Sequence, residues 1–81
     1  MTQVEFEELL ASKGVRRDAW SVGGGLPDEA YTLGRGWLGT WEVYYSERGA
    51  KQNRRTFLTR SAALEHLASR VLRDPTTRAK T

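Results

Sequence analysis

The chain has 81 residues, the size of one small domain, and it contains no cysteine, which excludes disulfide cross-links and thiolate metal sites. Its formal net charge is +3, but the N-terminus is acidic and therefore unlike a secretory signal. No apolar run approaches the roughly 20 residues that cross a bilayer, so we expect a soluble, cytoplasmic protein with no membrane partner.

The first predicted element is a helix over residues 3–13. Thr2 and Glu5 have the spacing of a capping box, and Gly14 favours a stop after the last turn. Between them, apolar side chains recur at helical spacing. The apolar face of this helix comprises Phe6, Leu9 and Leu10.

Residues 15–29 are expected to form an irregular connection, in which Trp20-Ser21-Val22 could make a very short edge strand. Gly23-Gly24-Gly25 predicts a flexible turn. A phosphate-binding loop is disfavoured here, because no lysine follows the glycines and no helix begins directly after them.

Three strands are predicted next, over residues 30–33, 40–46 and 54–58. The middle one has the clearest period-two pattern, in which Trp41, Val43 and Tyr45 alternate with Glu42, Tyr44 and Ser46. A glycine-rich turn precedes it and a polar reversal, from residue 47 to 53, follows it. These connections are too short for crossovers, which predicts an antiparallel meander.

A final helix is expected to begin after Thr59 and to end at Asp74-Pro75, because proline disfavours a helical residue before it. Residues 76–81 are polar and are predicted to be a flexible C-terminal tail. The order α-β-β-β-α predicts an α+β fold in which residues 1–75 form a single domain. Its sheet would be small and antiparallel, with three or four strands, and both helices would pack on one face. The apolar face of the final helix comprises Ala63, Leu64, Leu67, Ala68, Val71 and Leu72.

Candidate catalytic groups are sparse. His66 is the only histidine, and no neighbour in the sequence would make it a base or a metal ligand. Glu7 and Glu8 are adjacent on a helix and therefore diverge. We expect a protein that is not an enzyme and that needs neither a cofactor nor a metal.

Two aromatic residues leave alternatives open. Trp37 lies in a turn, where its side chain must either fold back onto the core or remain available to a partner. Tyr44 should lie on the sheet face opposite Trp41, where it could stack on a neighbouring residue or on a ligand.

Four segments within about residues 20–78 carry a resemblance to a known family. They are Leu26-Pro27-Asp28-Glu29-Ala30-Tyr31, Trp41-Glu42-Val43-Tyr44-Tyr45-Ser46-Glu47-Arg48-Gly49, Phe57 before a helix with Ala63, and Val71-Leu72-Arg73-Asp74-Pro75-Thr76. Together they resemble small bacterial immunity-type proteins encoded beside polymorphic or contact-dependent growth inhibition toxins. The resemblance implies a protein that binds one cognate toxin domain, often a nuclease, and blocks its active site or substrate access.

On this resemblance the partner is the C-terminal domain of a cognate toxin. Inhibitors of nucleases are commonly acidic, whereas here nine bases and two acids lie from Arg48 onward, against four bases and eight acids before it. The C-terminal half would therefore suit an acidic toxin face, although the same bases could simply be solvated. The expected toxin-binding residues share one sheet face or its connecting turn: Glu42, Tyr44, Glu47, Arg48, Arg54 and Arg55.

A second interpretation is nucleic-acid binding, because α-β-β-β-α is also the order of the double-stranded-RNA-binding domain. Arg54, Arg55 and Arg60 would then contact phosphates near the start of the last helix. The lysine cluster of that family is absent, since the sequence there reads Thr59-Arg60-Ser61-Ala62-Ala63. A third possibility is an adaptor that binds some other protein.

Overall fold

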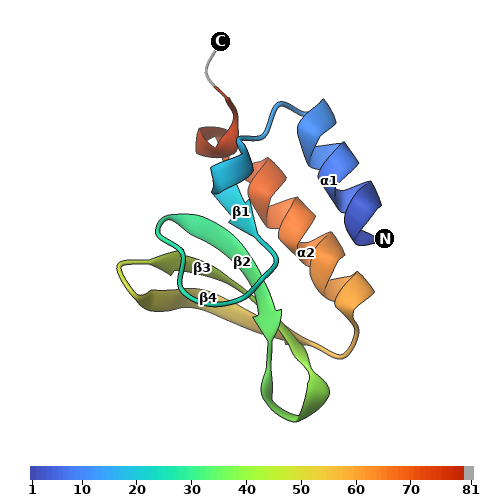
Figure 1. Ribbon diagram of the computed structural model, residues 1–81, viewed down its shortest axis with the longest axis vertical. Coiled ribbons are helices and arrows are strands. Elements are labelled where there is room, and N and C mark those ends of the chain that lie inside the picture. Colours follow the sequence, from blue (N-terminus) through green and yellow to red (C-terminus); the bar gives the residue numbers. More distant parts are fainter. Residues whose placement is uncertain (80–81) are drawn as a thin grey trace.

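The computed structural model describes residues 1–79, which form two helices and a four-stranded sheet. Both helices lie on one side of the sheet (Figure 1), as the sequence predicts for an α+β fold. The strand order is β1-β2-β3-β4. The elements are α1 (Gln3–Ser12), η1 (Arg17–Ala19), β1 (Trp20–Ser21), β2 (Ala30–Arg35), η2 (Trp37–Gly39), β3 (Trp41–Glu47), β4 (Ala50–Phe57), α2 (Arg60–Arg73) and η3 (Pro75–Thr77).

The core lies between α2 and the sheet. α1 packs beside α2 and adds Phe6 and Leu10 to this core. Thr2 and Glu5 form the predicted capping box at the start of α1, and the Thr59 side chain caps α2. The ring of Phe6 on α1 meets the edge of Trp20 with 5.0 Å between ring centroids. The other buried members of the core are Leu10, Leu33, Val43, Ala63, Leu64, Leu67, Ala68 and Val71.

The sheet is mixed and not purely antiparallel. β2, β3 and β4 form the predicted antiparallel meander, but Trp20 and Ser21 pair in parallel with Tyr31 and Thr32. A parallel pair needs a connection that returns to the starting end. Residues 22–29 make that return as an irregular loop. Part of this loop lies across a face of the sheet (Figure 1).

The hairpin between β3 and β4 is tighter than the predicted reversal over residues 47–53. Arg48 and Gly49 both have positive φ, of 52° and 76°, and Glu47 pairs with Ala50. Two central residues with positive φ match the twist of a hairpin. β4 therefore begins at Ala50, several residues before its predicted start at residue 54.

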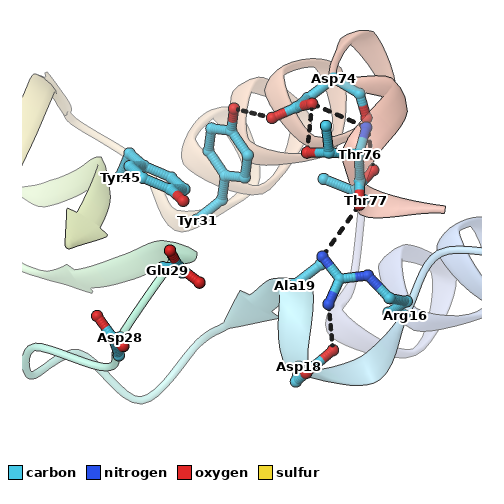
Figure 2. A pocket seen from close by; sticks show the side chains of 10 residues that line it. All are labelled: Arg16, Asp18, Ala19, Asp28, Glu29, Tyr31, Tyr45, Asp74, Thr76 and Thr77. Carbon is cyan, nitrogen blue, oxygen red and sulfur yellow. Dashed lines mark hydrogen bonds and ion pairs between the residues drawn. The ribbon is translucent and has the colours of Figure 1, made fainter. Parts of the chain in front are cut away.

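The segment after α2 is packed against the domain, in contrast to the predicted flexible tail. Thr77 is only 3% exposed, and its hydroxyl donates to the carbonyl oxygens of Val71 and Asp74 at 2.8 Å. Arg16 donates to the Thr76 carbonyl at 3.0 Å (Figure 2). Polar residues can dock in this way when their hydrogen bonds are satisfied internally. The part of the predicted tail at residues 80–81 lies outside the described residues.

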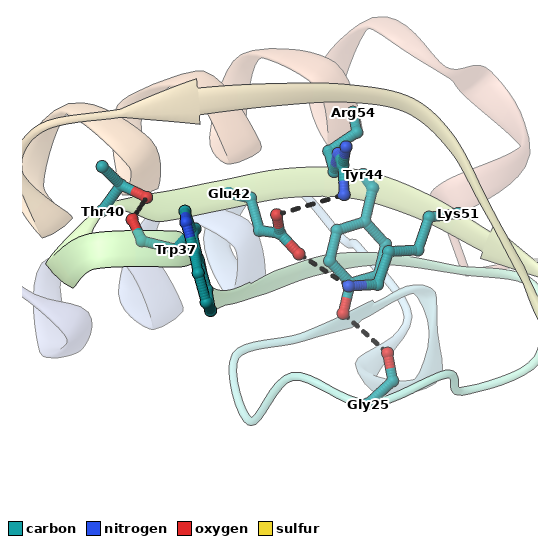
Figure 3. Close-up of polar contacts among 7 residues, drawn as sticks. All are labelled: Gly25, Trp37, Thr40, Glu42, Tyr44, Lys51 and Arg54. Carbon is teal, nitrogen blue, oxygen red and sulfur yellow. Dashed lines mark hydrogen bonds and ion pairs between the residues drawn. The ribbon is translucent and has the colours of Figure 1, made fainter.

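The sheet face away from the helices is also covered. The Gly24 amide donates to the Leu33 carbonyl at 3.0 Å, which attaches the loop to β2. A Cβ on Gly34 would lie 3.4 Å from the Gly24 Cα and 3.3 Å from the Tyr44 hydroxyl. The loop therefore approaches the sheet closely because residue 34 has no side chain. Of the glycines predicted to give a flexible turn, Gly24 approaches Gly34 and Gly25 accepts a hydrogen bond from Tyr44 (Figure 3).

Candidate functional site

Two of the six expected toxin-binding residues are enclosed by the fold. Tyr44 is 1% exposed and Glu42 is 6% exposed. The Tyr44 hydroxyl donates to the Gly25 carbonyl at 2.6 Å, across the gap between sheet and loop (Figure 3). Burial raises the pKa of this hydroxyl above its ordinary value. Of the two roles open to Tyr44, the structure shows the contact with a neighbouring segment.

Glu42 is the centre of a small charged cluster beside Tyr44. Its carboxylate accepts a hydrogen bond from the Lys51 Nζ at 2.7 Å and lies 3.8 Å from the Arg54 Nη1 (Figure 3). The Lys51 ammonium also lies 4.8 Å from the centroid of the Tyr44 ring. These contacts neutralise a carboxylate that burial would otherwise make costly.

The remaining expected binding residues do not form one surface. Glu47 and the exposed Arg48 lie at the β3–β4 turn. The register shifts between Val43 and Tyr45, so that β4 bulges opposite Tyr44. Beyond this bulge Arg55 pairs with the core residue Val43 and points to the helix side, whereas Arg54 reaches Glu42 on the loop side.

The hairpin between β2 and β3 ends in exposed apolar side chains. Trp37 is 85% exposed and Leu38 is 88% exposed, and Leu58, at the same end of the sheet, is 86% exposed. We call Trp37 and Leu38 the apolar tip. Of the two alternatives for Trp37, the structure shows a side chain that remains outside the core.

Local hydrogen bonds hold the apolar tip in a defined turn. The Trp37 carbonyl accepts from the Thr40 hydroxyl at 2.7 Å and from its amide at 3.3 Å, and Leu38 has a positive φ of 57°. At the base of the turn two guanidinium groups lie near the Trp41 ring, Arg35 at 4.6 Å and Arg60 at 5.7 Å from its centroid. Tryptophan and arginine are the usual anchors of protein interfaces.

A polar cleft of about 360 Å³ opens between η1, the start of β2 and η3 (Figure 2). Its main internal bond joins the Tyr31 hydroxyl to the Asp74 carboxylate at 2.8 Å. Burial, and then this bond, raise the pKa of Tyr31 to about 12. A phenol with so high a pKa is a poor acid–base group at neutral pH. In the described part of the chain, no three His, Cys, Asp or Glu residues are placed to hold a metal ion.

A basic groove of about 380 Å³ lies between β4 and α2. Arg54 and Arg55 were expected binding residues, but the sequence did not mark the α2 residues His66, Arg70 and Arg73 as part of the same site. Spacings of four and three along α2 place the latter on one side of the helix, a signal available from the sequence. The groove is lined by Asn53, Arg54, Arg55, His66, Arg70 and Arg73.

Within residues 1–79, no helix combines the length and the hydropathy that crossing a membrane requires. No protein-family model, curated protein or solved structure matches the chain.

Proposed function

We propose that this protein is an immunity-type protein, which binds a cognate bacterial toxin domain in the cytoplasm and blocks its active site or substrate access. The observation that supports this proposal is the apolar tip. Trp37 is 85% exposed and the adjacent Leu38 is 88% exposed. Their apolar surface is removed from water only when a partner covers it.

The tip is suited to act as an anchor because its backbone conformation is already defined. The Thr40 side chain bonds to the Trp37 carbonyl, so little backbone freedom is lost when a partner binds. Arg35, Leu58 and Arg60 extend the surface around the anchor with charge and further apolar area. This composition resembles the centre and rim of an interface that excludes water.

The charge distribution suggests which toxin face would be bound. Arg48 and Arg55 are exposed, and no ion pair joins either to a carboxylate within residues 1–79. An acidic toxin face would approach these bases faster than a neutral one, because opposite charges steer the encounter. Of the six residues expected from the sequence, the exposed ones remain candidates for this steering, whereas Tyr44 and Glu42 support the fold.

The test is protection against the toxin domain encoded by the adjacent gene, with binding measured by calorimetry. Co-expression of the wild-type chain should restore growth, and W37A combined with L38A should weaken the complex by about 30-fold or more, as expected for an interface anchor. V4A is the matched control, because Val4 is also an exposed apolar residue but lies on α1.

Killing that continues in the presence of the wild-type chain would reject the immunity function. Full affinity of the W37A/L38A variant would instead reject the apolar tip as the docking surface. Circular dichroism of the variants should be unchanged, because the replaced side chains make little contact with the core.

A further inference from the structure

The basic groove concentrates positive charge without a matching negative charge. Arg55 enters it from β4, and Arg70 and Arg73 enter from α2. Within residues 1–79 no ion pair joins any of these three guanidinium groups to a carboxylate. Asp74 lies beside Arg70 and Arg73, but its carboxylate accepts hydrogen bonds from Tyr31 and Thr76.

The groove side chains are held in place by the fold. The Arg70 Nη1 donates to the Asn53 carbonyl at 3.0 Å, and its guanidinium lies 5.4 Å from the centroid of the Tyr31 ring. The Arg73 Nε donates to the Ser69 carbonyl at 3.3 Å. Asn53 has a positive φ of 54° and lies at the β4 bulge, so the bulge shapes one wall of the groove.

His66 is affected by this excess of positive charge. Its ring packs on Phe57 with 4.9 Å between centroids, and its Nε2 is buried without a hydrogen-bond partner. Burial, followed by the charges of Arg70, Arg55 and Arg73, holds the pKa of His66 below its ordinary value. A bound anion would neutralise the surrounding charge and favour the protonated imidazole.

We propose that the basic groove binds a phosphate group. Several convergent guanidinium groups favour a phosphate over a single carboxylate, because phosphate offers three acceptor oxygens and up to two negative charges. The positive end of a helix dipole does not contribute, since Arg70 and Arg73 lie in the last turn of α2. The guanidinium groups themselves therefore supply the affinity.

The source of the phosphate is either a free phosphate compound or the backbone of a nucleic acid. The second source would connect the groove with the nucleic-acid interpretation of the sequence. It would use Arg54 and Arg55 opposite the middle and end of α2, away from the helix start, where Arg60 donates to Gln3 at 2.6 Å. A backbone phosphodiester has two free oxygens and one negative charge, so a nucleic acid would bind through several successive phosphates, whereas free phosphate would bind as a single, more highly charged anion. Neither source depends on the immunity function.

His66 provides the readout, because a single histidine gives unambiguous imidazole signals in the NMR spectrum of the full chain. Titration with inorganic phosphate at constant ionic strength should shift these signals saturably, with a Kd of about 1 mM or tighter. The pKa of His66 should rise when phosphate is bound. Acetate at the same ionic strength should bind at least about tenfold more weakly, since it has one charge and two oxygens.

Variants locate the site. R55Q and R73Q each remove an exposed guanidinium and should weaken phosphate binding by about tenfold or more. K13Q removes an equal charge from the end of α1 and should leave the affinity unchanged. The absence of a saturable shift, equal binding of acetate, or full affinity in the R55Q/R73Q double variant would each overturn the proposal.

A competing RNA duplex of about 16 base pairs then distinguishes the two sources. Displacement of phosphate by the duplex, with an affinity that falls steeply as salt rises, would assign the groove to a nucleic-acid backbone. Phosphate binding that the duplex does not affect would assign it to a free phosphate compound. Because no toxin is present, failure here leaves the immunity proposal unaffected.

Discussion

At the scale of single residues, Tyr44 connects the sheet to the loop over residues 22–29, which lies on the sheet face opposite the helices. It lies on β3, and its hydroxyl donates to the Gly25 carbonyl in the loop. Its ring is buried, and the Lys51 ammonium lies 4.8 Å from the ring centroid. A side chain with this environment contributes to stability more than to recognition.

Replacing Tyr44 with phenylalanine should destabilise the domain by about 1–2 kcal/mol, because the Gly25 carbonyl then loses its partner. Urea unfolding followed by tryptophan fluorescence measures the change. Y45F is the matched control, since the Tyr45 hydroxyl makes no hydrogen bond to the described residues and should cost little. Equal stability of Y44F and wild type would show that the loop contact is not stabilising.

At the scale of elements, the loop over residues 22–29 acts as a second covering layer for the sheet. On this face Thr32 and Ser46 are buried although they are polar, because the loop excludes water from them. The layer depends on the close approach of Gly24 to Gly34 and on the hydrogen bond from the Gly24 amide to the Leu33 carbonyl. An irregular segment with many glycines therefore covers this sheet face, as a helix does in other sheets that are covered on both faces.

A methyl group at residue 34 should push the loop away from the sheet. G34A is expected to destabilise the domain by about 1–3 kcal/mol, because its Cβ would lie 3.3 Å from the Tyr44 hydroxyl and 3.4 Å from the Gly24 Cα, so that a neighbour must shift by a few tenths of an ångström. G23A is the control: nothing lies within 4 Å of its Cβ and its φ is not positive. G23A should be neutral or stabilising by up to about 1 kcal/mol, through the unfolded chain. A result in which both variants behave alike would contradict a closely packed loop.

At the scale of the whole molecule, Asp74 joins the end of α2 to the sheet and to η3. Its carboxylate accepts from the Thr76 amide and hydroxyl, and from the Tyr31 hydroxyl on β2. These hydrogen bonds, the Thr76 side chain first, hold the pKa of Asp74 below its ordinary value. An ionised Asp74 carboxylate therefore contributes to the docking of the C-terminal segment, beside the bonds of Thr77 and Arg16.

Because the pKa of Asp74 is lowered in the folded state, its contribution is complete above the ordinary value of 3.8 and is lost as pH falls further. D74N should reduce stability at pH 7 by less than about 1 kcal/mol, since the group is largely solvated. The difference between D74N and wild type should disappear near pH 2. Chemical denaturation at both pH values measures this, and a difference that persists in acid would show that charge is not the cause.

The sequence alone determined the helices, the three antiparallel strands and their core face. Local signals specify these: the Thr2 capping box, the period-two pattern around Val43, and the stop at Pro75. The sequence also identified Trp37 and Arg55 as candidates for contact with a partner, but it did not identify the residues that surround them in the fold. Each of these features depends on a residue and its near neighbours in the chain.

Only the tertiary structure decided what lies on the other sheet face and which arginines converge. Tyr44 and Glu42 looked available because alternation places them away from the core, but Tyr44 bonds to a glycine loop distant in sequence from β3, and Glu42 pairs with Lys51 and Arg54 of β4. The basic groove likewise forms when β4 packs beside α2, which brings Arg55 to His66. Such contacts join segments that no local pattern relates, because they depend on chain packing in three dimensions.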